Sequence, residues 1–205
     1  MEFPVHVPVG PWRLHPHPLF EALAYVVGFQ LYLLLRRRQG DAFAPVRPVL
    51  VLAAVAGAFV GSRALALLED PAATWAGRAD IATWMAGKTI VGGLLGGWGA
   101  VELAKLGLQV RGATADLYPV PICIAIATGR LGCFLTGLED RTHGSATALP
   151  WGVDFGDGVA RHPTQLYEAA FVLLVAWLLL PTVARRRATA PAATAALPPA
   201  GRRWA

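Results

Sequence analysis

The sequence predicts an all-α integral membrane protein with about five transmembrane helices, its N-terminus outside and its C-terminus in the cytoplasm. Hydrophobic residues make up 55% of the 205 positions and charged residues 15%, whereas a soluble domain usually carries about 25% charged residues. Arginines also cluster at the ends of apolar runs, at 36–38 and 185–187, as they do at the cytoplasmic ends of membrane helices. The formal charge of +5 reflects these flanks, so we expect no nucleic-acid partner.

A membrane-spanning helix needs about 20 predominantly apolar residues, and five stretches meet this requirement. The first stretch precedes its arginine triplet, the reverse of a cleavable signal peptide, so we expect it to remain as an anchor. Residues 1–183 are expected to form one transmembrane domain. Residues 184–205, mainly Ala, Pro, Thr and Arg, are expected to form a disordered, basic cytoplasmic tail. The five predicted helices are 18–35, 49–68, 88–106, 117–135 and 164–183.

The distribution of Lys and Arg sets the predicted orientation. With the N-terminus outside, eleven basic residues flank the helices on the cytoplasmic side and five on the outer side, as the positive-inside rule requires. The two longest outer loops are then expected at about 69–87 and 136–163. The second loop is richer in polar residues, which makes it the expected place of function. The cytoplasmic set is Arg36, Arg37, Arg38, Arg47, Lys105, Arg111, Arg185, Arg186, Arg187, Arg202 and Arg203, and the outer set is Arg13, Arg78, Lys88, Arg141 and Arg161.

Several charged residues fall inside or near the predicted helices, where a charge costs at least about 2.5–3.5 kcal/mol. Glu102 is explained most simply by a local pair with Lys105, three residues further on. Glu21 and Arg63 both fall near outer helix ends, where they either pair with each other or take part in catalysis. Arg130 lies about one turn below the outer surface. A guanidinium at this depth favours a planar anionic partner, and a lipid phosphate is the natural candidate.

The densest polar stretch of the chain is R-H-P-T-Q-L-Y-E at 161–168. Pro163 suits the first turn of the last helix, so Gln165 and Glu168 share one helix face and Tyr167 lies at the membrane interface. An outer aromatic belt with a helix cap would account for Tyr167. It would not account for Arg, His, Gln and Glu crowded at one helix entrance, which indicates a functional site.

Glycines form two overlapping GxxxG pairs in the third predicted helix, Gly92-Gly93 with Gly96-Gly97. Such pairs usually allow two helices to pack closely. The alternative is that the bare backbone lines a lipid headgroup site, and the two interpretations are compatible.

No metal site and no cofactor are predicted. Cys123 and Cys133 lie ten residues apart in one apolar run, about 15 Å along a helix, which is too far for a disulfide. Cys133 is expected to be a small packing residue. His15 and His17 alternate with prolines and lack the further ligands that a metal site needs. We therefore expect this segment to be a rigid entry to the first helix.

Three places in the sequence resemble the motifs of one known protein family. Residues 129–134 read G-R-L-G-C-F, against a G-R-[IL]-G-N-F signature. P-W-G at 150–152 is followed by the octet at 161–168, and G-G-L at 92–94 resembles an H-G-G-L stretch. In these motifs the chain resembles the bacterial prolipoprotein diacylglyceryl transferases, over most of residues 18–180. The resemblance implies a multi-pass protein of the bacterial inner (cytoplasmic) membrane, with 1–183 as a transferase-like domain.

The resemblance also implies a reaction, in which phosphatidylglycerol donates its diacylglyceryl group to the thiol of a lipobox cysteine in a secreted precursor. The products are a thioether and glycerol phosphate. The leaving phosphate needs fixed cations and the thiol needs a base. Arg130 and Arg161 are the expected phosphate ligands, and His162 is the expected base, oriented by Glu139 or Glu168. The candidate substrate-binding residues are Arg63, Gly92, Gly93, Gln165, Tyr167 and Glu168.

The chain departs from the family pattern at three positions. Val91 stands where the family has histidine, Cys133 stands in place of the signature asparagine, and Leu138 displaces the carboxylate of Glu139 by one position. The chain also ends soon after the fifth predicted helix, so we expect a shortened member. These departures motivate a second hypothesis, a non-catalytic paralogue that binds phospholipid or a membrane partner. A transporter or channel is a third hypothesis, although the five helices show no inverted repeat.

Overall fold

The computed structural model describes residues 3–39, 43–85, 87–112 and 117–189. The chain divides into two compact units. Among the described residues, the first unit takes 3–39 and 117–189, and the second takes 43–85 and 87–112.

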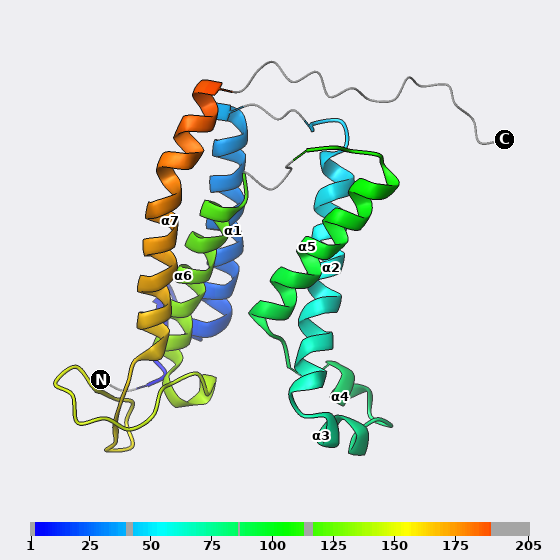
Figure 1. The fold of residues 1–205 in the computed structure, drawn as a ribbon. Coiled ribbons are helices and arrows are strands. Elements are labelled where there is room, and N and C mark those ends of the chain that lie inside the picture. The colour runs from blue at the N-terminus through cyan, green and yellow to red at the C-terminus, as the bar shows by residue number, and fades with distance from the viewer. Residues whose placement is uncertain (1–2, 40–42, 86, 113–116, 190–205) are drawn as a thin grey trace. The chain divides into compact units, whose positions relative to one another are not determined.

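In the first unit, helix α6 packs against both α1 and α7 (Figure 1). Prolines mark the helix starts, because a fixed φ suits the first turn: α1 begins at Pro16, α6 at Pro119, and α7 directly after Pro163. Gly137, with φ of +73°, turns the chain out of α6 into a short 3-10 helix, η1. The elements of this unit are β1 Val7–Val9, β2 Trp12–Leu14, α1 Pro16–Gln39, α6 Pro119–Thr136, η1 Gly137–Asp140, β3 Val153–Asp154, β4 Ala160–Arg161 and α7 Thr164–Thr189.

Small side chains allow these three helices to approach closely. Gly28 on α1 lies against Ala125 on α6, and a Cβ added to Gly132 would collide with Phe20. Such contacts replace the hydrophobic effect between helices that share an apolar solvent. The buried alanines of the three helices complete this core: Ala24, Ala127, Ala169 and Ala176.

In the second unit, α2 and α5 pack against each other along glycine faces. Gly57 and Gly61 on α2 lie against the backbone of Gly92 and Gly96 on α5, so a Cβ at any of these positions would collide with the partner helix. The predicted close packing is therefore confirmed for the Gly92 and Gly96 pair, whereas a Cβ on Gly93 would meet its nearest atoms only at 3.7 Å. The elements of this unit are α2 Arg47–Glu69, α3 Pro71–Ala76, α4 Ile81–Met85 and α5 Ile90–Gly107.

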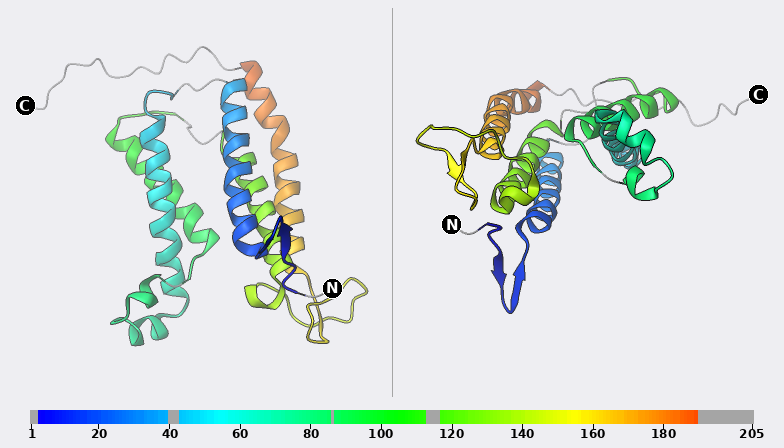
Figure 2. Two further views of the ribbon diagram at one scale, coloured as in Figure 1. Left: turned by 180° about the vertical axis from the view of Figure 1, so that it is seen from behind. Right: turned by 90° about the horizontal axis from the view of Figure 1, so that it is seen from below.

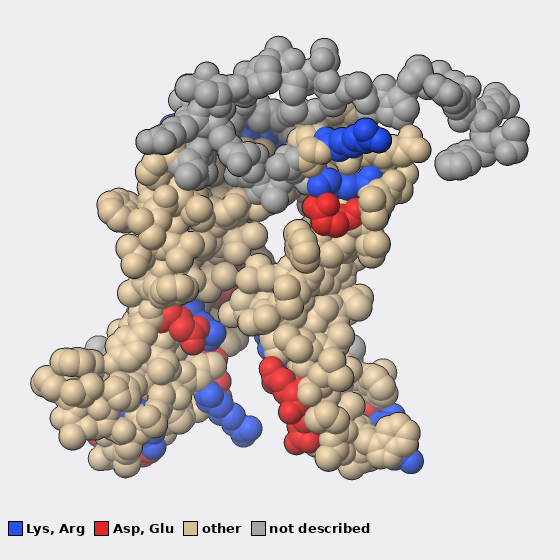
Figure 3. All heavy atoms as spheres, in the orientation of Figure 1, with Lys and Arg blue, Asp and Glu red and all other residues tan. Residues whose placement is uncertain are grey.

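Four of the described helices are long and apolar enough to cross a membrane. On the face shown in Figure 3, the surface of the helices is mostly uncharged and the charged side chains gather toward their ends. Large apolar side chains such as Leu52 and Phe171 point outward, which is the arrangement expected when lipid is the solvent. The segments are Pro16–Arg38, Arg47–Glu69, Pro119–Asp140 and Thr164–Pro181.

All five stretches predicted as membrane helices are helical in the structure, as α1, α2, α5, α6 and α7. The predicted outer loops contain structure that was not expected. Residues 69–87 include α3 and α4, and residues 136–163 include η1 and the antiparallel β3–β4 pair. A second antiparallel pair, β1–β2, precedes α1 and is dark blue in Figure 2. These strands have two or three residues, too few to show the alternation that reveals a strand in a sequence. Helix α7 continues to Thr189, and the rest of the expected tail, 190–205, lies outside the described residues.

Candidate active site

Arg130 joins α6 to α7 through an ion pair. Its Nη2 lies 2.5 Å from Oε2 of Glu168, and its side chain is 17% exposed while that of Glu168 is 48% exposed. The Nη1 atom of Arg130 lies 4.0 Å from the Sγ atom of Cys133, one turn further along α6. Its Nε is buried without a hydrogen-bond partner among the described residues. The guanidinium thus carries one buried donor whose hydrogen-bonding capacity is not met among the described residues.

Gln165 lies in the first turn of α7 and is completely buried. Neither atom of its amide has a hydrogen-bond partner in the described part of the chain. A buried polar group left in this state costs about 1–3 kcal/mol. Since Gln165 and Glu168 are three residues apart, they share one face of α7. The helix therefore presents an unsatisfied amide on the face whose carboxylate contacts Arg130.

The segment between η1 and α7 is connected to the start of α7 by backbone hydrogen bonds. The N–H of Gly144 donates to the carbonyl of His162 at 3.0 Å, and the N–H of His162 donates to the carbonyl of Ser145 at 3.1 Å. The hydroxyl of Thr164 donates to the carbonyl of Thr142 at 2.7 Å. These bonds fix the backbone of His162 at the entrance to the helix.

The side chain of His162 contacts Tyr167, one turn into α7. The His162 Nδ1 lies 3.2 Å from the hydroxyl oxygen of Tyr167, which also accepts a 2.8 Å hydrogen bond from Nε1 of Trp151. In the tautomer whose Nδ1–H donates to Tyr167, the Nε2 lone pair is free to take a proton. The partner of His162 is therefore Tyr167, and neither of the carboxylates predicted to orient this histidine forms that contact.

Arg161 is held by a different carboxylate from Arg130. Its Nη1 and Nη2 donate to the two carboxylate oxygens of Asp157 at 2.6 and 2.7 Å, and Nη1 also donates to the carbonyl of Val159. This bidentate hydrogen bonding lowers the pKa of Asp157 and raises the pKa of Arg161. Arg161 thus closes the β3–β4 turn.

Glu139 lies at a separate place in the same unit. Its Oε2 is 3.3 Å from Nε2 of His15, so it does not orient His162 as predicted. A pocket of about 350 Å³ lies beside this pair. Its lining is formed by the start of α1 and the end of α6 with η1: His15, His17, Pro18, Thr136, Glu139 and Asp140.

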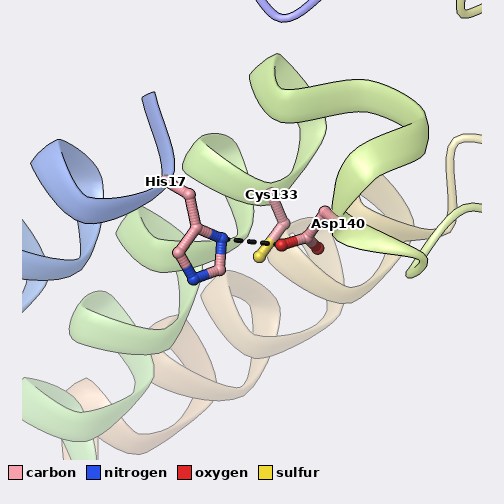
Figure 4. A group of neighbouring side chains, drawn as sticks. All are labelled: His17, Cys133 and Asp140. Atoms are coloured by element: carbon pink, nitrogen blue, oxygen red, sulfur yellow. Dashed lines mark ion pairs between the residues drawn. The ribbon is translucent and has the colours of Figure 1, made fainter. Parts of the chain in front are cut away.

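His17, Cys133 and Asp140 form a second polar group on the same elements (Figure 4). The Nδ1 of His17 lies 2.6 Å from Oδ1 of Asp140, whose side chain is only 6% exposed. Sequence reasoning treated His17 as part of a rigid entry and did not single out Asp140. The signals in the sequence were the two histidines spaced by proline and the adjacent Glu139 and Asp140.

Three predicted residues belong to the second unit. Arg63 stacks over the ring of Phe59, with 5.5 Å from Cζ to the ring centroid. A Cβ on Gly92 would collide with the α2 backbone, whereas the atoms nearest to a Cβ on Gly93 would lie 3.7 Å away. A substrate-binding role for these three residues stays a prediction.

The family model for prolipoprotein diacylglyceryl transferase matches residues 4–197. The phosphatidylglycerol–prolipoprotein diacylglyceryl transferase of Solidesulfovibrio magneticus is 34% identical over 195 residues, which cover 85% of this chain and 69% of the relative. The enzyme of the same name from Methylococcus capsulatus is 32% identical over 201 residues, 89% of this chain and 71% of the relative. That of Geobacter sulfurreducens is 39% identical over 111 residues, 51% of this chain and 40% of the relative. The chain therefore belongs to the prolipoprotein diacylglyceryl transferase family.

Proposed function

We propose that this chain transfers a diacylglyceryl group from phosphatidylglycerol to the cysteine thiol of a lipobox-containing precursor. Family membership and the names of the relatives support this reaction. The observation that carries it is the convergence of three separate motifs. Arg130 of the G-R-L-G-C-F stretch contacts Glu168 of the octet, and Trp151 of P-W-G contacts Tyr167 of the same octet.

The phosphate of the donor is bound by Arg130 and Gln165. The buried Nε of Arg130 and the buried amide of Gln165 are both without partners among the described residues. A phosphate oxygen would satisfy both donors, and a charge-assisted hydrogen bond to a guanidinium is among the strongest available. Glu168 holds the guanidinium in place before the donor arrives. Arg161, held by Asp157, binds the same phosphate from the loop side once it is released from that carboxylate.

The reaction then needs a proton acceptor for the thiol. His162 takes that proton on Nε2 while its Nδ1–H donates to Tyr167. The thiolate sulfur attacks the glycerol carbon that bears the phosphate. The carbon–oxygen bond breaks, its electron pair leaves on the phosphate oxygen, and glycerol phosphate departs. The Arg130 guanidinium stabilises the charge that gathers on this leaving group.

The membrane topology follows from the same proposal. The transferase-like domain, residues 1–183, lies in the bacterial inner membrane and has five spans. These are the four segments given above together with α5. Glu102 and Lys105 on α5 form an ion pair at 2.9 Å, which supports its insertion because paired charges cost less in a membrane than single ones. The N-terminus is outside, so the residues at the entrance to α7 face the non-cytoplasmic side. The excess of basic residues on the other side supports this orientation.

The test is a transfer assay with labelled phosphatidylglycerol and a lipobox peptide, using the purified full chain in detergent. We expect turnover by the wild type and a loss of about 100-fold or more in Arg130→Ala, because removal of one preorganised charge-stabilising donor costs this much. Arg130→Lys keeps the charge but not the planar fork, so it is expected to recover only part of the rate.

Arg13→Ala is the matched control, since Arg13 lies on the exposed β2 strand. This variant is expected to keep wild-type turnover. Equal activity in Arg130→Ala and wild type would remove the basis of the proposal. Binding of phosphatidylglycerol without any transfer by the wild type would instead favour the non-catalytic paralogue.

A further inference from the structure

Three potential metal ligands converge at the start of α1 and the end of α6. The ligand atoms of His17, Cys133 and Asp140 all lie within 4.8 Å of one another. Figure 4 shows the imidazole, the thiol and the carboxylate pointing toward one another from α1, α6 and η1. The sequence alone predicts no further metal ligands for His15 and His17. The fold brings Cys133 and Asp140 to His17 from more than a hundred positions away along the chain.

We propose that His17, Cys133 and Asp140 bind a divalent transition metal ion, of which zinc is the best match. Imidazole nitrogen, thiolate sulfur and carboxylate oxygen are the three donor types that zinc takes in proteins. Hard ions such as magnesium and calcium prefer oxygen ligands and would not select a thiolate. Three protein ligands leave the fourth tetrahedral position for water or a substrate atom.

The distances suit such an ion after a small adjustment. With zinc bonds of roughly 2.0–2.3 Å, tetrahedral ligand atoms lie about 3.3–3.8 Å apart. The present 2.6 Å contact between His17 Nδ1 and Asp140 Oδ1 is a hydrogen bond with a proton between the two atoms. A metal ion replaces that proton and moves the two atoms apart by about 1 Å. The side chain of His17 is 35% exposed, so it has room to move.

The residues that contact the proposed ligands are arranged as they usually are around metal sites in proteins. A metal-bound histidine usually directs its other ring nitrogen toward a carboxylate. The Nε2 of His17 lies 3.8 Å from Oε2 of Glu21, one helical turn further along α1. The hydroxyl of Thr142 donates to Oδ2 of Asp140 at 2.5 Å, which fixes the carboxylate and leaves Oδ1 for the ion.

Access also supports the site. His17 and Asp140 line the pocket of about 350 Å³, so an ion and its water can enter from that side. The Nη1 of Arg130 lies 4.0 Å from the sulfur of Cys133. A zinc ion bound by this sulfur would itself deprotonate the thiol, because a coordinating thiol gives up its proton to the metal's charge. Cys133 stands in place of the signature asparagine, so the site would belong to chains with cysteine at this position.

The experiment measures zinc binding by the full chain in detergent, prepared without a polyhistidine tag. Competition with a chromophoric chelator gives the affinity, and cobalt substitution reports the sulfur ligand through a thiolate-to-cobalt charge-transfer band. We expect one ion per chain in the wild type. In Cys133→Asn and in Asp140→Asn, the affinity is expected to fall by more than about 100-fold, since even residues behind the ligands contribute 10–100-fold. The cobalt charge-transfer band is expected to be absent in Cys133→Asn.

Cys123→Ser is the matched control, because Cys123 lies on the same helix outside the cluster. It is expected to bind zinc with wild-type affinity. Thermal unfolding of each variant without metal shows that it is folded, and zinc is expected to raise the melting temperature of wild type and Cys123→Ser alone. No zinc binding by the wild type, or equal binding by Cys133→Asn, would overturn the proposal. Neither result bears on transfer activity, which is measured separately with labelled lipid.

Discussion

Glu168 on α7 contacts Arg130 on α6 through a short ion pair, with 2.5 Å between Oε2 and Nη2. The pair joins the two helices that carry the most specific motifs of the chain. It also holds in a fixed orientation a guanidinium whose buried Nε has no partner in the part of the chain that the structure describes. The account of the site depends on this arrangement.

A double-mutant cycle with Arg130→Ala and Glu168→Ala measures the strength of that ion pair. Exposed pairs contribute about 0.2–1 kcal/mol and breaking buried pairs costs about 3–5 kcal/mol. With side-chain exposures of 17% and 48%, the pair lies between these limits. We expect a coupling of about 1–2 kcal/mol in denaturant unfolding in detergent. A coupling of zero would mean that the two side chains act independently and that Glu168 does not hold Arg130.

Gln165→Leu separates stability from function at the start of α7. The wild-type amide is completely buried and unsatisfied among the described residues, so an apolar side chain of similar size is expected to stabilise the protein by roughly 1–3 kcal/mol. The same change removes a ligand for the phosphate and is expected to lower kcat/KM for phosphatidylglycerol. Thermal unfolding measures the change in stability, and the transfer assay measures the change in kcat/KM. A variant that is stabilised and fully active would show that Gln165 does not contact the donor.

Tyr167→Phe removes the oxygen that links His162 to Trp151. Without it the imidazole loses the group that fixes its tautomer. We expect kcat to fall by about 10- to 100-fold, less than the roughly 100- to 10,000-fold that a complete acid–base group usually contributes, because His162 itself remains. Trp151→Phe removes only the second hydrogen bond to the same oxygen, so its effect is expected to be smaller. Steady-state kinetics on both variants test this order. The reverse order would mean that Tyr167 acts as a side chain of the membrane interface and does not position His162.

The ion pair of Asp157 with Arg161 predicts a pH dependence of the β3–β4 turn. The folded pKa of Asp157 lies below its ordinary value, because Arg161 donates two hydrogen bonds to the charged carboxylate. The pair therefore stabilises the turn fully at pH values above about 4, the ordinary pKa of an aspartate. This stabilisation is lost as the pH falls through the lowered pKa of Asp157 in the folded protein. The protection of the amides of residues 153–161, measured relative to their intrinsic exchange rates, is expected to fall in this acid range for the wild type.

Asp157→Asn is the control for that measurement and a test of Arg161. Exchange in this variant is expected to be fast already at neutral pH and to lack the acid transition. The freed guanidinium is also expected to bind phosphatidylglycerol more tightly than in the wild type. Unchanged or weaker lipid binding would mean that Arg161 only stabilises the turn, and that Arg130 binds the phosphate without it.

The helices and the local motifs could be predicted from the sequence because both are short-range signals. A long apolar stretch fixes a helix by itself, and Gln165 and Glu168 share a face through helical spacing alone. The partners of these residues depend on packing between elements far apart in the chain. His15 and Glu139, for example, are 124 positions apart. For this reason the group formed by His17 and Asp140 was missed. The contact of His162 with Tyr167 spans only five positions, but His162 precedes the first residue of α7, so helical spacing does not predict it.

The central claim is that Arg130 and Gln165 bind the phosphate of an anionic lipid. Native mass spectrometry of the purified chain tests it most directly, with phosphatidylglycerol and zwitterionic phosphatidylcholine supplied together. We expect the wild type and Arg13→Ala to retain phosphatidylglycerol, whose headgroup has a net negative charge that phosphatidylcholine lacks. The double variant Arg130→Ala, Gln165→Leu is expected to retain much less of it. Equal retention of phosphatidylglycerol by the double variant and the wild type would contradict the account.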